Sequence, residues 1–154
     1  MTIDVQLIGI IGAGQMGIGI AQVLATSELD VIIHDNDENV HSTATKVLEK
    51  SLIRAVNKGK LEKVKASDVL KRIFFRPHIS DLANCDLIIE AATEDELIKH
   101  NIFQSLIPYL RPDTILTSNT SSISITRLAA RTDRPDKFMG CHFMKPAPIM
   151  QLVE

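Results

Sequence analysis

The chain has 154 residues, 45% of them hydrophobic, and a formal net charge of −2 at pH 7. This length suits one domain, and the balanced charge gives no reason to expect a nucleic-acid partner. Asp4 stands where a signal peptide needs basic residues, so we expect neither a targeting segment nor a membrane segment. Cys85 and Cys141 lie far apart without metal-ligand spacing, which predicts free thiols, no metal site and a cytoplasmic protein.

The most informative segment joins the first apolar run to the first helical pattern. Residues 5–11 are typical of a parallel strand buried on both faces, and residues 15 to about 25 of a helix. Between them lies Gly12-Ala13-Gly14-Gln15-Met16-Gly17. Gly12 permits a tight turn, Gly14 lets the backbone approach a pyrophosphate, and Gly17 lets the helix pack closely. The free N–H groups of the helix then face the phosphates.

An acid stands at the distance that a dinucleotide site requires. The second apolar run, residues 31–34, ends at Asp35, eighteen residues after Gly17. A carboxylate there accepts both hydroxyls of an adenosine ribose and repels a 2′-phosphate, which predicts NAD rather than NADP. Methyltransferases and flavoproteins share the glycine pattern, so this interpretation depends on the strand, the helix and the acid together.

The rest of the chain alternates between helical and strand patterns. We expect helices over 39–57, 58–71, 95 to about 110, and 123–131, and strands at 72–76, 86–91, 114–118 and 138–143. The first two helices follow one another and predict a protruding arm. Prolines at 146 and 148 exclude regular structure before a short strand-like run at 150–153. The pattern predicts a Rossmann-type α/β fold, doubly wound, with a mainly parallel sheet.

Polar side chains gather where the predicted strands end. Because ligands of open parallel sheets bind beyond the carboxyl ends of the strands, Asp35, 91–96, 118–122 and His142 should lie at one edge. An imidazole suits proton transfer to an alcohol, and Glu154 can return to hold it. A core histidine bonded to backbone and a solvated glutamate are the alternatives.

Four motifs in order carry a family resemblance. The sequence resembles the amino-terminal NAD-binding domain of the 3-hydroxyacyl-CoA dehydrogenases, in the bacterial 3-hydroxybutyryl-CoA branch, along essentially its whole length. The family's GxGxMGxGIA, Glu-Ala-x-x-Glu, SNTSS and GxHFxxPxPxMxLVE correspond to Gly12–Ala21, Glu90–Glu94, Ser118–Ser122 and Gly140–Glu154.

The resemblance implies a reaction and a role for each matching residue. His142 would be the general base at the 3-hydroxyl of a (3S)-3-hydroxyacyl-CoA, paired with Glu154, while Ser121 binds the 3-oxygen. The product would be a 3-ketoacyl-CoA, as in fatty acid β-oxidation. Residues implied at the cofactor are Glu94, Lys99 and Asn119, beside Asp35 and the glycine loop. On the arm, Ser51 and Lys58 would contact CoA, or be ordinary helix surface.

Two departures from the family bear on activity. Lys145 replaces the usual asparagine, and we expect the chain, as an NAD-binding domain over 1–154, to lack the family's helical carboxyl-terminal domain. That domain supplies most of the family's homodimer interface, so a monomer or non-native association is expected. A cofactor-binding module without turnover is one alternative. Another is a different Rossmann enzyme, such as a hydroxyacid dehydrogenase with a catalytic lysine or a methyltransferase, which leaves the pairing of His142 with Glu154 unexplained.

Overall fold

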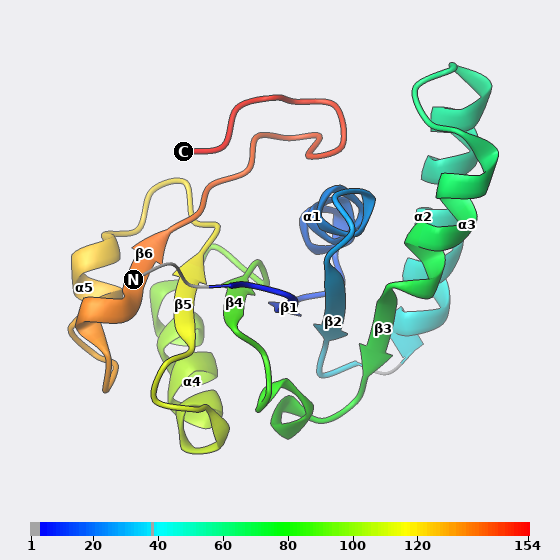
Figure 1. The fold of residues 1–154 in the computed structure, drawn as a ribbon. Coiled ribbons are helices and arrows are strands. Elements are labelled where there is room, and N and C mark those ends of the chain that lie inside the picture. Colours follow the sequence, from blue (N-terminus) through cyan, green and yellow to red (C-terminus); the bar gives the residue numbers. More distant parts are fainter. Residues whose placement is uncertain (1–3, 38) are drawn as a thin grey trace.

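One parallel sheet organises the molecule, in a computed structural model that describes residues 4–37 and 39–154. Its order is β3-β2-β1-β4-β5-β6, and every strand pairing in those residues is parallel (Figure 1). The strands are β1 (Leu7–Ile11), β2 (Asp30–His34), β3 (Ile73–Arg76), β4 (Leu87–Glu90), β5 (Ile115–Ser118) and β6 (Phe138–Gly140). The order reverses between β1 and β4, where parallel sheets open a crevice for ligands. The doubly wound fold predicted from the sequence is confirmed.

The central strand β1 shows why its sequence is almost continuously apolar. Ile8 and Ile10 enter the hydrophobic cluster on one face of the sheet, and Ile11 enters the cluster on the other. Gly9 leaves room for a neighbouring strand's side chain, since a Cβ there would lie 2.6 Å from Cδ1 of Ile88. Burial on both faces removes the alternation that a half-exposed strand would show.

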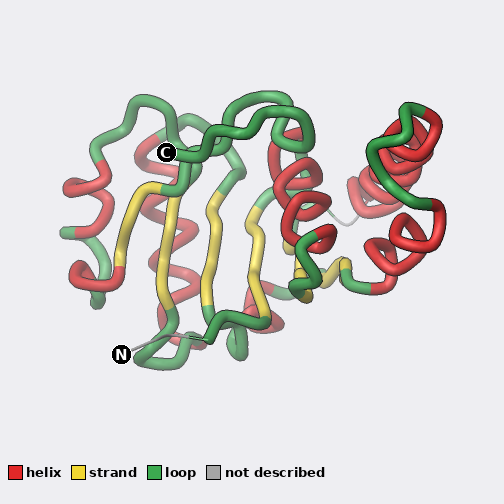
Figure 2. Tube along the Cα trace, turned by 45° about the horizontal axis from the view of Figure 1, so that its top comes forward, coloured by secondary structure: helices red, strands yellow, loops and turns green. Residues whose placement is uncertain are grey.

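Helices cover both faces of the sheet (Figure 2). One layer contains α1 (Gln15–Thr26), α2 (Asn39–Asn57) and α3 (Lys63–Lys71), and the other contains α4 (Glu96–Leu106) and α5 (Ile125–Ala129). The predicted arm is confirmed as the hairpin of α2 and α3, which extends beyond the edge strand β3 (Figure 1). None of the helices in the described ranges is long and apolar enough to cross a bilayer.

Several predicted helices are shorter than their patterns. The second arm helix starts at Lys63 rather than at residue 58, because Gly59, with φ of 66°, turns the chain first. Helix α4 ends at Leu106, and a 3₁₀ turn containing Pro108 follows, since proline cannot donate the next helical hydrogen bond. The expected helix over 123–131 is reduced to α5, whose first turn is capped by the Ser124 hydroxyl.

The last strand is shorter than predicted and ends before His142. The Cys141 N–H still donates to the Ser118 carbonyl at 3.0 Å, but the Phe143 N–H donates to Oδ1 of Asn119 at 2.7 Å. The strand-like run at 150–153 makes one antiparallel bridge, between Phe143 and Val153. His142 therefore lies just beyond β6. The backbone of the next residue, Phe143, bonds to the Asn119 side chain and pairs with Val153.

The arm is expected to depend on one buried stripe of α2. Leu48 is buried in the cluster shared with α1 and β1, whereas Ile53 on the same helix is exposed. We expect Leu48→Ala to lower the free energy of unfolding by about 2–5 kcal/mol, the usual cost of a cavity in a packed core. Denaturant unfolding measures it, with Ile53→Ala as the control expected to change little. Equal effects of the two substitutions would contradict this packing.

Candidate active site

The glycine loop after β1 leaves no room for side chains at its first and last glycines. Gly12 has φ of 106°, and a Cβ on it would lie 2.7 Å from the Ala91 carbonyl oxygen. A Cβ on Gly17 would lie 1.8 Å from the Gly12 carbonyl oxygen, so the loop closes directly onto the first turn of α1. Gly14 is different, because nothing lies within 4 Å of its Cβ position. The backbone at Gly14 is thus open to a ligand.

The amino end of α1 has the chemistry of an anion site. Gly14 is the N-cap residue, no side chain caps the helix, and the first turn has no acidic residue. The N–H groups of that turn are therefore free to bind an anion, and the helix dipole favours it. Gln15 is exposed and Met16 half-buried at this end. A pyrophosphate fits here without any cationic side chain.

Asp35 lies at the carboxyl end of β2, beside the glycine loop. Its Oδ2 accepts the Ala13 N–H at 2.8 Å, and its Oδ1 accepts the Asp37 N–H at 3.1 Å. A carboxylate has about four acceptor positions, so two remain for ribose hydroxyls. A pocket of about 310 Å³ adjoins this carboxylate, and its lining includes His34, Asn36, Ala92, Ile98 and Asn101. Its size and mixed lining fit the adenosine half of a dinucleotide.

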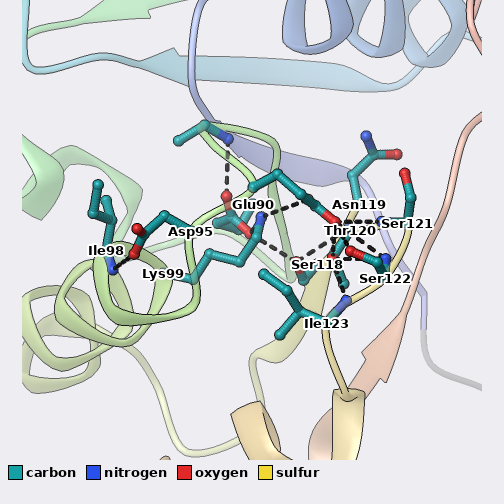
Figure 3. Close-up of polar contacts among 12 residues, drawn as sticks. Glu90, Asp95, Ile98, Lys99, Ser118, Asn119, Thr120, Ser121, Ser122 and Ile123 are labelled. Atoms are coloured by element: carbon teal, nitrogen blue, oxygen red, sulfur yellow. Dashed lines mark hydrogen bonds and ion pairs between the residues drawn. The ribbon is translucent and has the colours of Figure 1, made fainter.

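A buried ion pair joins the ends of β4 and β5 to α4. Nζ of Lys99 lies 2.5 Å from Oε2 of Glu90, and both side chains are almost wholly removed from solvent (Figure 3). The same oxygen accepts the Ser118 hydroxyl at 2.7 Å, and Oε1 accepts the Ala92 N–H at 2.8 Å. Asp95 caps α4 through the Ile98 N–H and so sets the turn that carries Lys99. One carboxylate thus ties the end of β4 to α4, to β5 and to the chain that follows β4.

A second carboxylate, that of Glu94, holds the 119–122 loop through hydrogen bonds. Its Oε1 accepts the Thr120 hydroxyl at 2.6 Å, the N–H groups of Ser121 and Ser122 at 3.0 and 3.1 Å, and the Ser122 hydroxyl at 3.0 Å. Partial burial raises the pKa of Glu94, but these hydrogen bonds outweigh burial and leave the pKa below its ordinary value. Nζ of Lys99 lies 3.9 Å from the other oxygen. The ionised carboxylate thus orders the loop.

Three side chains form a line at the sheet edge. Nε2 of His142 lies 3.3 Å from the Ser121 hydroxyl, and Nδ1 lies 3.1 Å from Oε2 of Glu154. A carboxylate at Nδ1 favours the tautomer with its proton there, which leaves the Nε2 lone pair facing the hydroxyl. The side chains of His142 and Glu154 are 22% and 60% exposed, so a substrate can reach them. This arrangement can transfer a proton to or from an alcohol.

The remaining predicted residues fall into two groups. Asn119 lies within the cluster, where its N–H donates to the Glu90 carbonyl at 2.8 Å and its side chain holds the Phe143 N–H. Ser51 and Lys58 belong to the arm, which lies across α1 from the His142 segment in both views (Figures 1 and 2). The structure does not bring these two residues to the cluster. Lys145 is exposed, three residues beyond His142.

An anion site at the point where a parallel sheet reverses its order defines a dinucleotide-binding Rossmann domain. The family described as "3-hydroxyacyl-CoA dehydrogenase, NAD binding domain" matches residues 7–154, and the chain belongs to that family. NAD is therefore its dinucleotide, as the sequence predicted.

Individual relatives agree with this assignment. A Deinococcus radiodurans protein named probable 3-hydroxybutyryl-CoA dehydrogenase is 49% identical over 95% of the chain and 52% of its own length. The Bradyrhizobium diazoefficiens 3-hydroxybutyryl-CoA dehydrogenase is 45% identical over 100% of the chain and 53% of its own length. The crystal structure of (S)-3-hydroxybutyryl-CoA dehydrogenase from Ralstonia eutropha is 40% identical, with a TM-score of 0.94 over 97% of the chain and 53% of that chain. The chain spans about half the length of these relatives.

The buried network around Glu90 is not predicted by the sequence patterns. The motif identifies Glu90 without a partner, and the resemblance implies a place for Lys99 at the cofactor without indicating its ion pair with Glu90. A glutamate that ends an apolar strand, with a lysine nine residues later, was the available signal. That signal indicates an ion pair only if the end of β4 and the first turn of α4 lie side by side, which the spacing of the two residues does not reveal.

Breaking the buried pair from one side should be costly. Lys99→Met leaves the Glu90 carboxylate buried without its cation, and we expect a loss of about 3–5 kcal/mol in the free energy of unfolding. Denaturant unfolding at pH 7 measures this loss, and adding Glu90→Gln should recover part of it. The control is Lys71→Met, which removes an exposed pair with Asp68 worth at most about 1 kcal/mol. If Lys99→Met costs no more than Lys71→Met, the pair does not organise the site.

The Glu94 carboxylate should make the loop contacts sensitive to acid. Because its pKa is lower in the folded protein, it stabilises the fold above its ordinary pKa of 4.5, and this stability is lost as pH falls through the folded pKa. Glu94→Gln should therefore destabilise the protein at pH 7, and the difference from the parent should disappear in acid. Urea unfolding across this range measures the difference. Glu49→Gln, on the exposed face of α2, is the control and should change stability little at any pH. If the stability difference between Glu94→Gln and the parent does not change with pH, the Glu94 carboxylate does not stabilise the loop as described.

Proposed function

We propose that this chain is the NAD-binding half of a dehydrogenase that oxidises (3S)-3-hydroxyacyl-CoA to 3-ketoacyl-CoA. The observation that carries the proposal is the line formed by Ser121, His142 and Glu154, at the sheet edge that also holds the dinucleotide site. The names of the relatives, 3-hydroxybutyryl-CoA dehydrogenases, support a short-chain substrate.

The chain's residues divide the binding of NAD between two regions. The N–H groups from Gly14 onward hold the pyrophosphate, and the free acceptor positions of Asp35 take the ribose hydroxyls and disfavour a 2′-phosphate. Glu94 and Asn119, which hold Ser121 and Phe143, would set the nicotinamide end, and the buried Lys99 would act there through Glu94. When bound, NAD supplies the acceptor for the hydride from C3.

The protein's own chemistry is the movement of one proton. Nε2 of His142 removes the proton of the 3-hydroxyl, and Glu154 stabilises the resulting imidazolium through Nδ1. The Ser121 hydroxyl donates to the 3-oxygen as it becomes a carbonyl. In the reverse direction His142 returns the proton to the same oxygen. The Ser121 hydroxyl lies 3.3 Å from Nε2, so on substrate binding it turns its proton from Nε2 to the 3-oxygen.

The arm is proposed to bind the CoA part of the substrate through Ser51 and Lys58. Lysine and arginine outnumber acids along α2, α3 and their connection, and a cationic surface suits the phosphates of CoA. The cations are Lys46, Lys50, Arg54, Lys58, Lys60, Lys63, Lys65 and Lys71, against Glu49, Glu62 and Asp68.

A cofactor-binding module without turnover is the second candidate. The exposure of Glu154 favours it, because 60% of its side chain meets solvent, and water weakens the electrostatic effect of the carboxylate on the imidazole. A cytoplasmic location is proposed with either function, and the free cysteines at 85 and 141 support it.

Reduction of acetoacetyl-CoA by the chain, followed as loss of NADH absorbance, tests the proposal. His142→Ala should lower the rate by about 10²–10⁴-fold, the usual contribution of general acid–base catalysis, while NADH affinity, measured by fluorescence, stays unchanged. The control is His78→Ala, which removes an exposed histidine outside the cluster.

The outcomes separate the two candidates. Turnover that depends on His142 supports the dehydrogenase. NADH binding without turnover supports the cofactor module and contradicts activity of this chain by itself. Absence of both overturns the proposed function.

A further inference from the structure

We propose that Gly19 is a positioning residue for the pair of His142 and Glu154. Its missing side chain lets the 143–153 loop rest on α1, and this contact fixes the loop whose two ends carry the pair. The inference rests on the proposed roles of His142 and Glu154, and it deepens them by naming what holds their geometry.

The first observation is the close approach at Gly19. This glycine lies in the interior of α1, where alanine would be the better helix former. A Cβ on Gly19 would lie 3.2 Å from both Cβ of Ala147 and Cδ of Pro148, closer than ordinary van der Waals contact. The loop therefore sits against the helix backbone itself. Any side chain at position 19 must push the loop outward or distort the helix.

The second observation is where the loop is buried. Ala147 is 4% exposed and belongs to the same hydrophobic cluster as Ile18 and Ala21 of α1. Towards the loop's other end, Ile149, Met150, Leu152 and Val153 are all exposed. Beyond Phe143, which is buried beside His142, Ala147 is thus the buried point of a loop that otherwise runs over the surface, and Figure 1 shows this orange-red segment passing α1.

The third observation is how the loop ends. The His142 N–H donates to the Glu154 carbonyl at 2.8 Å, and the Glu154 N–H donates to the His142 carbonyl at 3.0 Å. Their side chains meet at 3.1 Å between Nδ1 and Oε2. The loop is therefore closed at the pair and anchored between its ends on α1. Lifting Ala147 from the helix strains the backbone bonds that align the carboxylate with the imidazole.

Together these contacts give α1 two tasks. Its amino end offers free N–H groups to the pyrophosphate, and its middle seats the loop that aligns the proton-transferring pair. One rigid helix thereby sets the cofactor and the base relative to each other. Gly17 serves the first task and Gly19 the second.

The test compares enlarged side chains at two places on α1 in the cofactor-free chain. Gly19→Val adds bulk under the loop. The control Ala25→Val adds bulk at a buried position near the other end of α1, which adjoins Val69 and Phe74. Amide hydrogen exchange and the ring nitrogen NMR signals of His142 are measured, with Glu154→Ala as the spectroscopic reference for a lost Nδ1 contact.

We expect Gly19→Val to speed exchange of the His142 and Glu154 amides by at least about tenfold, which corresponds to about 1.4 kcal/mol of overpacking. The His142 ring signals should move towards those of Glu154→Ala. Ala25→Val should leave both unchanged relative to the rest of the sheet. Gly19→Ala should have a smaller effect, and adding Ala147→Gly should reverse part of it, because the contact with Pro148 at 3.2 Å remains.

Equal acceleration of all amides, unchanged ring signals, or no rescue by Ala147→Gly would overturn the proposal, because each would mean that Gly19 serves only helix packing. These readouts need no cofactor or turnover. Failure of the proposed function would instead appear as absent NADH binding or absent turnover, so the two failures are distinguishable.

Discussion

A carboxylate that is wholly buried at the end of a strand must find compensating charge and hydrogen bonds, and Glu90 imposes this requirement on the whole site. Lys99 supplies the charge from α4, while Ser118 and the Ala92 N–H supply the hydrogen bonds from β5 and the chain after β4. Desolvation makes such a group costly unless every partner is in place. The strand ends and α4 must therefore adopt one relative arrangement.

The positions of Ser121 and His142 depend on that arrangement. The 119–122 loop follows Ser118 at the end of β5. Hydroxyl and N–H groups of this loop donate to the Glu94 carboxylate, which holds the loop in place. Ser121 reaches His142 from this loop, and Asn119 fixes the residue that follows His142. The buried pair of Glu90 and Lys99 thus helps to determine where the side chains of Ser121, His142 and Glu154 meet.

Local patterns in the sequence were sufficient for the fold and for the geometry of the glycine loop and its neighbour Asp35. The continuous apolar run of β1, the spacing of Gly12, Gly14 and Gly17, and the position of Asp35 each follow from local backbone and burial requirements, so they could be predicted. The end of β6 and the contacts of Lys99 could not, because they depend on groups that only the fold brings together, namely Asn119 for β6 and Glu90 for Lys99. The roles of Ser51 and Lys58 stay predictions, since the arm's ligand contacts depend on a molecule that approaches from outside.

The hydrogen bond from the Ala13 N–H to Asp35 has a consequence for how the dinucleotide arrives. It ties the glycine loop to β2 while the phosphate position is still open at Gly14. The entropy of ordering that loop is thus lost during folding rather than at binding, so more of the interaction energy remains available as affinity. The same hydrogen bond couples the ribose site to the phosphate site. A ligand that shifts Asp35 through the ribose also shifts the glycine loop that binds its phosphates.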